Sequence, residues 1–245
     1  MHKQEDYQFD MGLNTHTAVD WKNFCRDITV DYFVHNPTKI GLYGNPCYHF
    51  LIYFVLYIGA GGAIVEIDET VITRPKYNRG KVVASEQWWG GGGGNGKGWG
   101  SHLTGIIPLR YFGGVERGTN KCFIVPVKRR DAATLLPIIQ QHIYLGATII
   151  SGCWAAYNRI DELPELYTHY TVNHSEAFVD EETGAHTNTI ESTWQKFKSG
   201  HKKRFGTHRS LFSTYLCDFL WRRQFSGPYV FYNFWTQVAS LYPIE

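Results

Sequence analysis

Residues 148–158 read TIISGCWAAYN, a short apolar run that a glycine interrupts. Thr148 to Ser151 have the composition of a short strand buried in a core. Gly152 ends this run, and WAAYNRIDEL (154–163) then favours a helix. The pattern predicts a core strand that ends at a glycine and passes into a helix.

Strand and helix signals continue on both sides of this stretch. Before it, we expect three strands and then a helix capped by Asp131, in AIVEIDET (63–70), KVVAS (81–85), KCFIVPV (121–127) and DAATLLPIIQQHI (131–143). After it, we expect one strand and two helices, in YTHYTVN (167–173), HTNTIESTWQKFK (186–198) and RSLFSTYLCDFLWRRQF (209–225). The order is three strands, helix, strand, helix, strand and helix. It predicts an α/β fold with a ribonuclease-H-like mixed sheet and C-terminal helices.

The composition fits a globular intracellular protein. Of 245 residues, 43% are hydrophobic and 16% aromatic, which suits a packed core, while a net charge of +2 does not by itself indicate nucleic acid. Five widely spaced cysteines without a CxxC pair argue against a disulfide framework and a zinc ribbon, and fit a reducing compartment. The polar start, MHKQEDYQFD, predicts no secretory signal.

Two segments differ from their surroundings. Leu42–Val65 carries no Asp, Glu, Lys or Arg and is long enough to span a bilayer. We favour instead an insertion that leads into a core strand, over a membrane span at 48–65. The second segment, Trp89–Arg110, starts with a glycine tract and shows no periodicity.

Two acidic residues are candidates for chemistry. Asp68 lies in an apolar strand, where a carboxylate costs free energy unless it is paired, binds a metal, or marks an exposed strand end. Glu191 follows the apolar Ile190 in an amphipathic helix and by itself reads as a solvated glutamate. In a ribonuclease-H-like sheet, acids on the first strand, the fourth strand and the last helix converge and hold two magnesium ions about 4 Å apart. Asp68 and Glu191 occupy the first and third of these places, and Gly152 occupies the second.

Six motifs together resemble the DDE transposase domain of the ISXO-like insertion sequences and of the eukaryotic Merlin elements. They run in order between about residue 17 and about residue 225: IVEIDET, KYNRGK, FGGVERGT, IISGCWAAYN, VNHSEAFVD and GAHTNTIESTWQKFK. The resemblance implies metal-dependent DNA cleavage and strand transfer with Mg²⁺ or Mn²⁺. It also implies transposon ends and target DNA as partners, self-association, a nuclear location in a eukaryotic cell, and no membrane partner.

The family pattern at the fourth strand resembles S-D-x-W-x-A-Y, whereas this chain reads Ser151-Gly152-Cys153-Trp154-Ala155-Ala156-Tyr157. Gly152 therefore stands where the second catalytic aspartate is expected. We expect catalysis to be impaired, so that the chain is either a weakened transposase or a DNA-binding protein without chemistry.

The resemblance also divides the chain. It implies a mainly helical N-terminal remnant (1–40), a DDE domain (61–225) and a C-terminal tail (226–245). Relatives join the flanks of residues 42–60 and 89–110 almost directly, so these two runs are either retained introns or insertions that loop out at a strand edge. No DNA-recognition module is predicted in the first forty residues, although relatives often carry one upstream.

Charge after the candidate acid Glu191 is strongly positive. Between Ser192 and Arg223, eight Lys and Arg side chains stand against Asp218 alone, a net charge of +7. Such a stretch would follow DNA phosphates, although a solvated helix face is the simpler alternative. The predicted DNA-binding residues are Arg79, Lys81, Lys196, Lys198, Lys202, Lys203 and Arg204. The predicted supporting residues, at family positions near the site, are Asn173, His174 and His186, and no zinc site is predicted.

Overall fold

The computed structural model describes residues 12, 14–40, 62–72, 110–119, 121–173, 179, 184–204 and 207–243. The strands are β1 Ile64–Val71, β2 Arg110–Glu116, β3 Cys122–Val127, β4 Thr148–Gly152 and β5 Thr168–Val172. The α-helices are α2 Thr15–His35, α4 Ala132–His142, α5 Asn188–Lys203, α6 Phe212–Gln224 and α7 Val230–Leu241. Two short 3-10 helices are η3 Ala155–Tyr157 and η4 Arg209–Leu211.

The described strands form one mixed sheet in the order β3-β2-β1-β4-β5. β1, β2 and β3 pair antiparallel, whereas β4 pairs parallel to β1 and β5 parallel to β4. This is the ribonuclease-H-like arrangement, with the first strand at the centre, and it confirms the predicted fold class.

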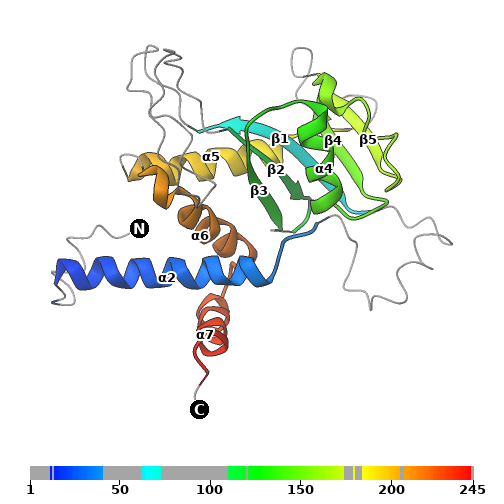
Figure 1. Ribbon diagram of the computed structural model, residues 1–245. Coiled ribbons are helices and arrows are strands. Elements are labelled where there is room, and N and C mark those ends of the chain that lie inside the picture. Colours follow the sequence, from blue (N-terminus) through cyan, green and yellow to red (C-terminus); the bar gives the residue numbers. More distant parts are fainter. Residues whose placement is uncertain are drawn as a thin grey trace, which may run out of the picture.

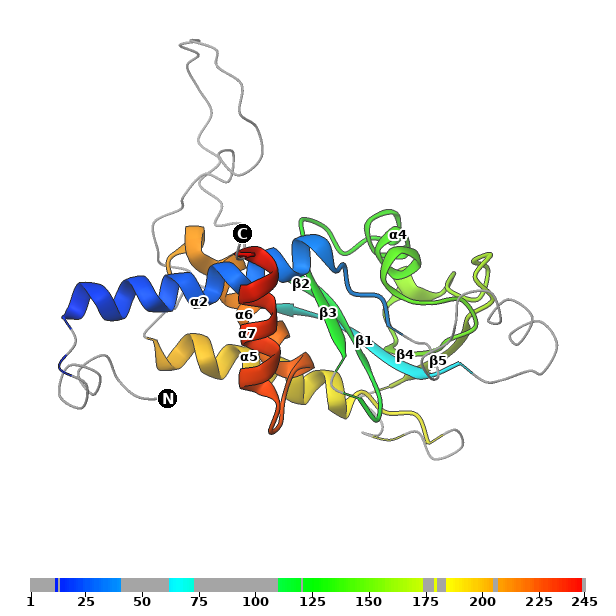
Figure 2. The same cartoon turned by 90° about the horizontal axis from the view of Figure 1, so that it is seen from below.

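Helices cover both faces of the sheet. α4 lies on one face and α5 on the other, where α6 packs against β3 and shares a core with α5, and α2 packs against α6 (Figures 1 and 2). The residues of β1 alternate between these faces: Val65 and Ile67 belong to the core under α4, while the polar Glu66 and Asp68 contact residues of α5. The face under α5 therefore carries the polar residues that matter for a site.

The second strand differs from the prediction. The expected strand at 81–85 lies outside the described residues, and the strand that pairs with β1 is β2, within which the motif FGGVERGT begins. Residues 42–60 and 89–109 also lie outside the described part, and Arg110, expected at the end of an insertion, is the first residue of β2. Two central glycines lower the strand propensity of β2, and for this reason the strand was not predicted from the sequence.

Gly113 shows why glycine is needed in this strand. A Cβ at this position would lie 2.8 Å from Cη2 of Trp194 and 2.8 Å from the carbonyl oxygen of Phe123. The absence of a side chain thus lets the indole of Trp194, from α5, lie directly on the sheet beside β1.

The helix expected at 154–163 is wrong. The chain forms only the single 3-10 turn η3 after β4 and continues through further turns to β5. Asp161 accepts a hydrogen bond from the backbone N–H of His169 at 2.9 Å, and Pro164 follows, so both residues favour turns over a continuing helix.

Most of the apolar run considered as a membrane span, residues 42–61, lies outside the described residues. Ile64 and Val65, at the end of the apolar run, belong to β1. No described helix combines the length and the apolar character needed to cross a bilayer.

Candidate active site

Asp68 projects from the central strand toward α5. Its Oδ2 accepts a hydrogen bond from the indole Nε1 of Trp194 at 3.1 Å. Burial raises the pKa of the Asp68 carboxyl to about 6, and the nearby charges of Glu69 and Glu191 contribute to the rise. Asp68 is therefore a carboxylate held in a partly desolvated position next to α5.

Glu191 lies in the first turn of α5, where a negative charge is favoured by the helix dipole. Its Oε1 accepts a hydrogen bond from Oγ1 of Thr187, the residue that precedes the helix, at 3.2 Å. Because its charge acts on Asp68, the structure brings these two predicted acids, from β1 and α5, into one neighbourhood.

Gly152, the last residue of β4, is the third position of the expected site. β1 and β4 pair through Ile64↔Thr148, Val65↔Ile149 and Glu66↔Ile150. Continued by two residues, the same offset brings Gly152 level with Asp68, on the same face of the sheet. Gly152 is not among the glycines with positive φ, so its backbone conformation is open to any residue. An aspartate at this position would meet no conformational barrier from the backbone.

A fourth residue, Glu66, was missed by the sequence reading. Its fully buried carboxylate accepts hydrogen bonds from two backbone N–H groups of α5, those of Thr189 at 2.8 Å and Ile190 at 3.0 Å. Nε of Arg117 donates to Glu66 Oε1 at 2.6 Å, and Nη2 of the same arginine donates to the carbonyl oxygen of His186 at 2.6 Å. Nδ1 of His186 lies 3.5 Å from Glu66 Oε1.

This network replaces the usual helix cap. The side chain of the N-cap residue Thr187 makes no capping hydrogen bond, so Glu66 satisfies first-turn N–H groups that would otherwise lack partners. The signal in the sequence was an acid inside the apolar run IVEI, together with a distant arginine in FGGVERGT. The predicted supporting residue His186 belongs to this network, whereas Asn173 is exposed just after β5 and His174 lies outside the described residues.

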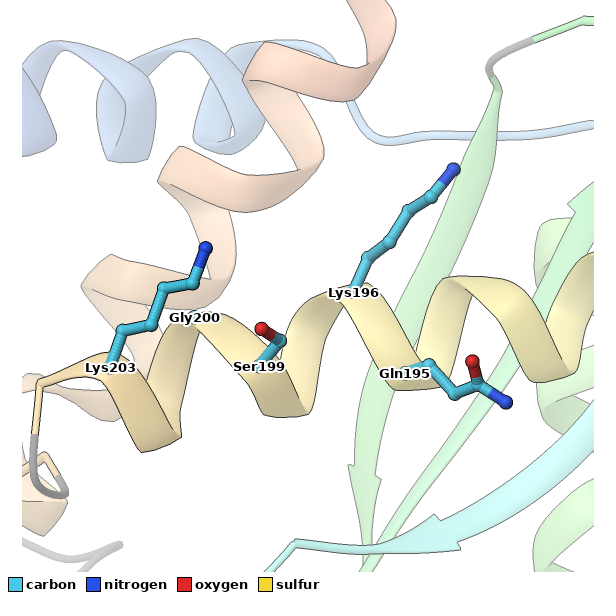
Figure 3. A pocket seen from close by; sticks show the side chains of 5 residues that line it. All are labelled: Gln195, Lys196, Ser199, Gly200 and Lys203. Atoms are coloured by element: carbon cyan, nitrogen blue, oxygen red, sulfur yellow. The ribbon is translucent and has the colours of Figure 1, made fainter. Parts of the chain in front are cut away.

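Basic side chains lie along α5 after Glu191. Lys196 and Lys203 line a shallow groove with Gln195, Ser199 and Gly200, and the two lysines extend to the same side of the helix (Figure 3). Lys202 is exposed, Lys198 is half-buried, and the guanidinium of Arg204 lies 4.1 Å from the ring centroid of Tyr215. The predicted Arg79 and Lys81 lie outside the described residues.

A pair of divalent ions needs several carboxylate ligands at this site. Asp68 and Glu191 supply two carboxylates, and the position level with Asp68 on β4 supplies none. Within the described part of the chain, no group of three His, Cys, Asp or Glu residues could hold a metal ion. The residues present therefore do not fit a two-ion centre.

Comparisons with known proteins agree with this architecture. The model of a family described as the ISXO2-like transposase domain matches residues 62–224, from just before β1 to the end of α6. A protein of Haemophilus influenzae (strain ATCC 51907 / DSM 11121 / KW20 / Rd), named an uncharacterized transposase-like protein, is 28% identical over 102 residues, covering 42% of this chain and 80% of its own.

Two solved structures show a weak similarity to the chain. The catalytic core domain of BIV integrase gives a TM-score of 0.40 at 10% identity, covering 74% of this chain and 98% of its own. A pre-cleavage Mos1 transpososome gives 0.26 at 10% identity, covering 98% of this chain and 74% of its own.

We expect Glu66→Ala to destabilise the protein by about 3–5 kcal/mol, because it leaves Arg117 and the first-turn N–H groups of α5 without a buried partner. Urea denaturation measures the change in the free energy of unfolding. Glu162, in an exposed pair with Arg159, is the matched control, and Glu162→Ala should change stability by less than about 0.5 kcal/mol. Equal losses in the two variants would contradict the role of Glu66 in holding α5.

Asp68 should make stability depend on pH. Its pKa is about 6 in the folded state and 3.8 for the unperturbed group, so the folded protein holds this proton to higher pH than the unfolded chain. Stability is therefore lost as the pH rises from about 4 to about 7, by about 2–3 kcal/mol, and Asp68→Asn should remove this loss.

The experiment is urea denaturation of both proteins across this pH range. The two should be similar near pH 4, and Asp68→Asn should be the more stable near pH 7. Asp131 is a control whose pKa is shifted in the opposite direction, because hydrogen bonds from Thr134 lower it. Asp131→Asn should therefore not increase stability at neutral pH. A stability difference between the wild type and Asp68→Asn that does not change with pH would argue against a desolvated carboxylate.

Proposed function

Because the chain belongs to the ISXO2-like transposase family, we propose that it is a transposase-derived domain that binds DNA through α5, with cleavage and strand transfer impaired by Gly152. The proposed impairment rests on the pairing register of β1 and β4. Continued by two residues beyond the pair Glu66↔Ile150, this register puts Gly152 level with Asp68. The self-association and nuclear location implied by the resemblance stay predictions.

The other acids near β4 do not replace the lost carboxylate. Asp161 is exposed in the turns after η3, and its Oδ1 accepts the backbone N–H of His169. Glu69 follows Asp68 directly and therefore projects to the opposite face, where its carboxylate lies 3.7 Å from Nε of Arg130. The site thus lacks the negative charge that two divalent cations require, and we expect little cleavage from the chain as it stands.

A second candidate function is DNA binding without any chemistry. It is favoured by the basic groove on α5, which is formed by Lys196 and Lys203 and involves neither Asp68 nor Gly152. DNA binding and DNA cleavage therefore depend on different residues of the same helix and its neighbours, and each can be measured separately.

We expect replacement of both Lys196 and Lys203 by alanine to weaken binding to duplex DNA of any sequence. The slope of log K against log salt concentration should become smaller by about 2, because two phosphate contacts are lost. Fluorescence anisotropy at several salt concentrations measures this slope. Lys39, which lies over the ring of Tyr144 away from α5, is the control, and Lys39→Ala should leave the slope unchanged. An unchanged slope in the double variant would rule out this groove as the DNA interface.

We expect Gly152→Asp to restore nicking of supercoiled DNA in Mg²⁺ or Mn²⁺, with a rate at least about 100-fold above the wild type, because it supplies the missing carboxylate. Gly152→Asn, of similar size but uncharged, should stay at the wild-type level. Adding Glu191→Gln to Gly152→Asp should remove the gain. If both the wild type and Gly152→Asp nick DNA at the same measurable rate, the impairment is disproved. If neither protein nicks DNA, the chain is a DNA-binding protein without chemistry.

A further inference from the structure

A tryptophan two residues beyond Gly152 is held in a fixed orientation at the surface. Trp154 is 39% exposed, and its indole Nε1 donates a hydrogen bond to the carbonyl oxygen of Arg130 at 2.8 Å. The guanidinium of Arg130 lies over the ring, 3.7 Å from the centroid. The cation covers one face of the indole, and the indole N–H is hydrogen-bonded. The exposed part of the ring is therefore held in place as a flat surface, which we call the platform.

Arg130 is itself held from its other side by Glu69. Its Nε lies 3.7 Å from Oε1 of Glu69, whose side chain is only 8% exposed and which directly follows Asp68. These contacts join the end of β1 to the turn after β4. The platform is therefore tied to the same two strand ends that carry Asp68 and Gly152.

The base of this cluster contains unsatisfied polar atoms. Within the described part of the chain, Glu69 Oε1, Arg130 Nε and the hydroxyl of Tyr157 are buried without a hydrogen-bond partner. The three groups are nevertheless neighbours of one another: Arg130 Nε and Glu69 Oε1 are 3.7 Å apart, and the hydroxyl of Tyr157 interacts with Glu69. The buried base of the cluster therefore links Arg130 to β1 and to η3.

The charge around the platform suits nucleic acid. Residues 128–130 read Lys-Arg-Arg, and Lys128 is exposed beside the Arg130 that stacks on the indole. Arg129 is paired with Asp131 at 2.7 Å and Arg130 with Glu69 at 3.7 Å, so the local excess of positive charge comes from Lys128. A cation next to an exposed aromatic ring is the combination that binds single-stranded DNA, with the base on the ring and the phosphate near the cation.

We propose that Trp154 and Arg130 form a binding site for one unpaired nucleotide, whose base stacks on the indole and whose phosphate lies beside the guanidinium. A base inside a duplex is already stacked and cannot reach such a ring, so the ligand is a nucleotide at a frayed or overhanging end. This inference rests on the proposed DNA binding and adds a preference for the kind of DNA. It does not depend on whether the chain cleaves DNA.

The test compares two DNA probes of equal length, a blunt duplex and a duplex with a short overhang that carries 2-aminopurine. The wild type should bind the overhang probe more tightly and quench its 2-aminopurine fluorescence, because stacking on the indole quenches this base. Trp154→Ala should lose the quenching and about 5- to 100-fold of the affinity for the overhang probe, with unchanged affinity for the blunt duplex. Trp154→Phe, which keeps an aromatic ring, should retain part of both signals.

Trp235, 53% exposed on α7, is the matched control, and Trp235→Ala should behave as the wild type. Thermal unfolding of each variant shows whether it is folded, and Trp154→Phe carries the test if Trp154→Ala is not. Equal binding of the two probes by the wild type, or quenching that survives in Trp154→Ala, would overturn this inference alone. No salt-dependent binding of either probe by the wild type would overturn the proposed DNA binding, and this inference with it.

Discussion

The arrangement of the site depends on one buried charge. The carboxylate of Glu66 is fully buried in the central strand, where an unpaired charge would be very unfavourable. It is satisfied by an arginine just after β2 and by two backbone N–H groups at the start of α5, so these groups must come together for the protein to fold. The positions of Glu191 and Trp194 relative to the sheet follow from this constraint.

The same constraint explains how the fold can persist without the second acid. Glu66 holds α5 on the sheet, and Gly113 leaves the space that the indole of Trp194 occupies beside Asp68. Neither contact involves Gly152, whose φ is in the ordinary range and whose strand β4 stays paired with β5 to its last residue. Gly152 therefore takes part in neither of the contacts that hold α5 on the sheet.

Binding and chemistry are also separated along α5. The acid lies in the first turn, near the positive end of the helix dipole, and the lysines that line the groove lie one to three turns later. On the opposite face of the sheet, the stack of Arg130 on Trp154 extends the site around the ends of β1 and β4. The residues proposed to bind DNA are therefore distributed over several elements, whereas the candidate catalytic acids Asp68 and Glu191 lie close together.

Local patterns in the sequence were sufficient for much of the fold. Periodicity and capping predicted α4 with its Asp131 cap, α5, β4 and the central strand, because each signal is complete within one segment. The strand β2 was missed, and the helix expected after β4 was wrong. Gly113 makes room for Trp194, Gly114 lies against the ring of Phe123, and Asp161 accepts the backbone N–H of His169. None of these contacts is visible in the local pattern of the strand or of the turns.

The sequence alone determined the order of most elements, though not β2 or the turns after β4, together with the family and the glycine at the strand end, since these are properties of the chain read in order. Only the tertiary structure showed the register of β1 and β4 from which this glycine is placed level with Asp68, that Glu66 holds the helix carrying Glu191, and that Arg130 stacks on Trp154. These are contacts between residues that are far apart in the chain. Strand register and burial bring them together, and neither is encoded in any single segment.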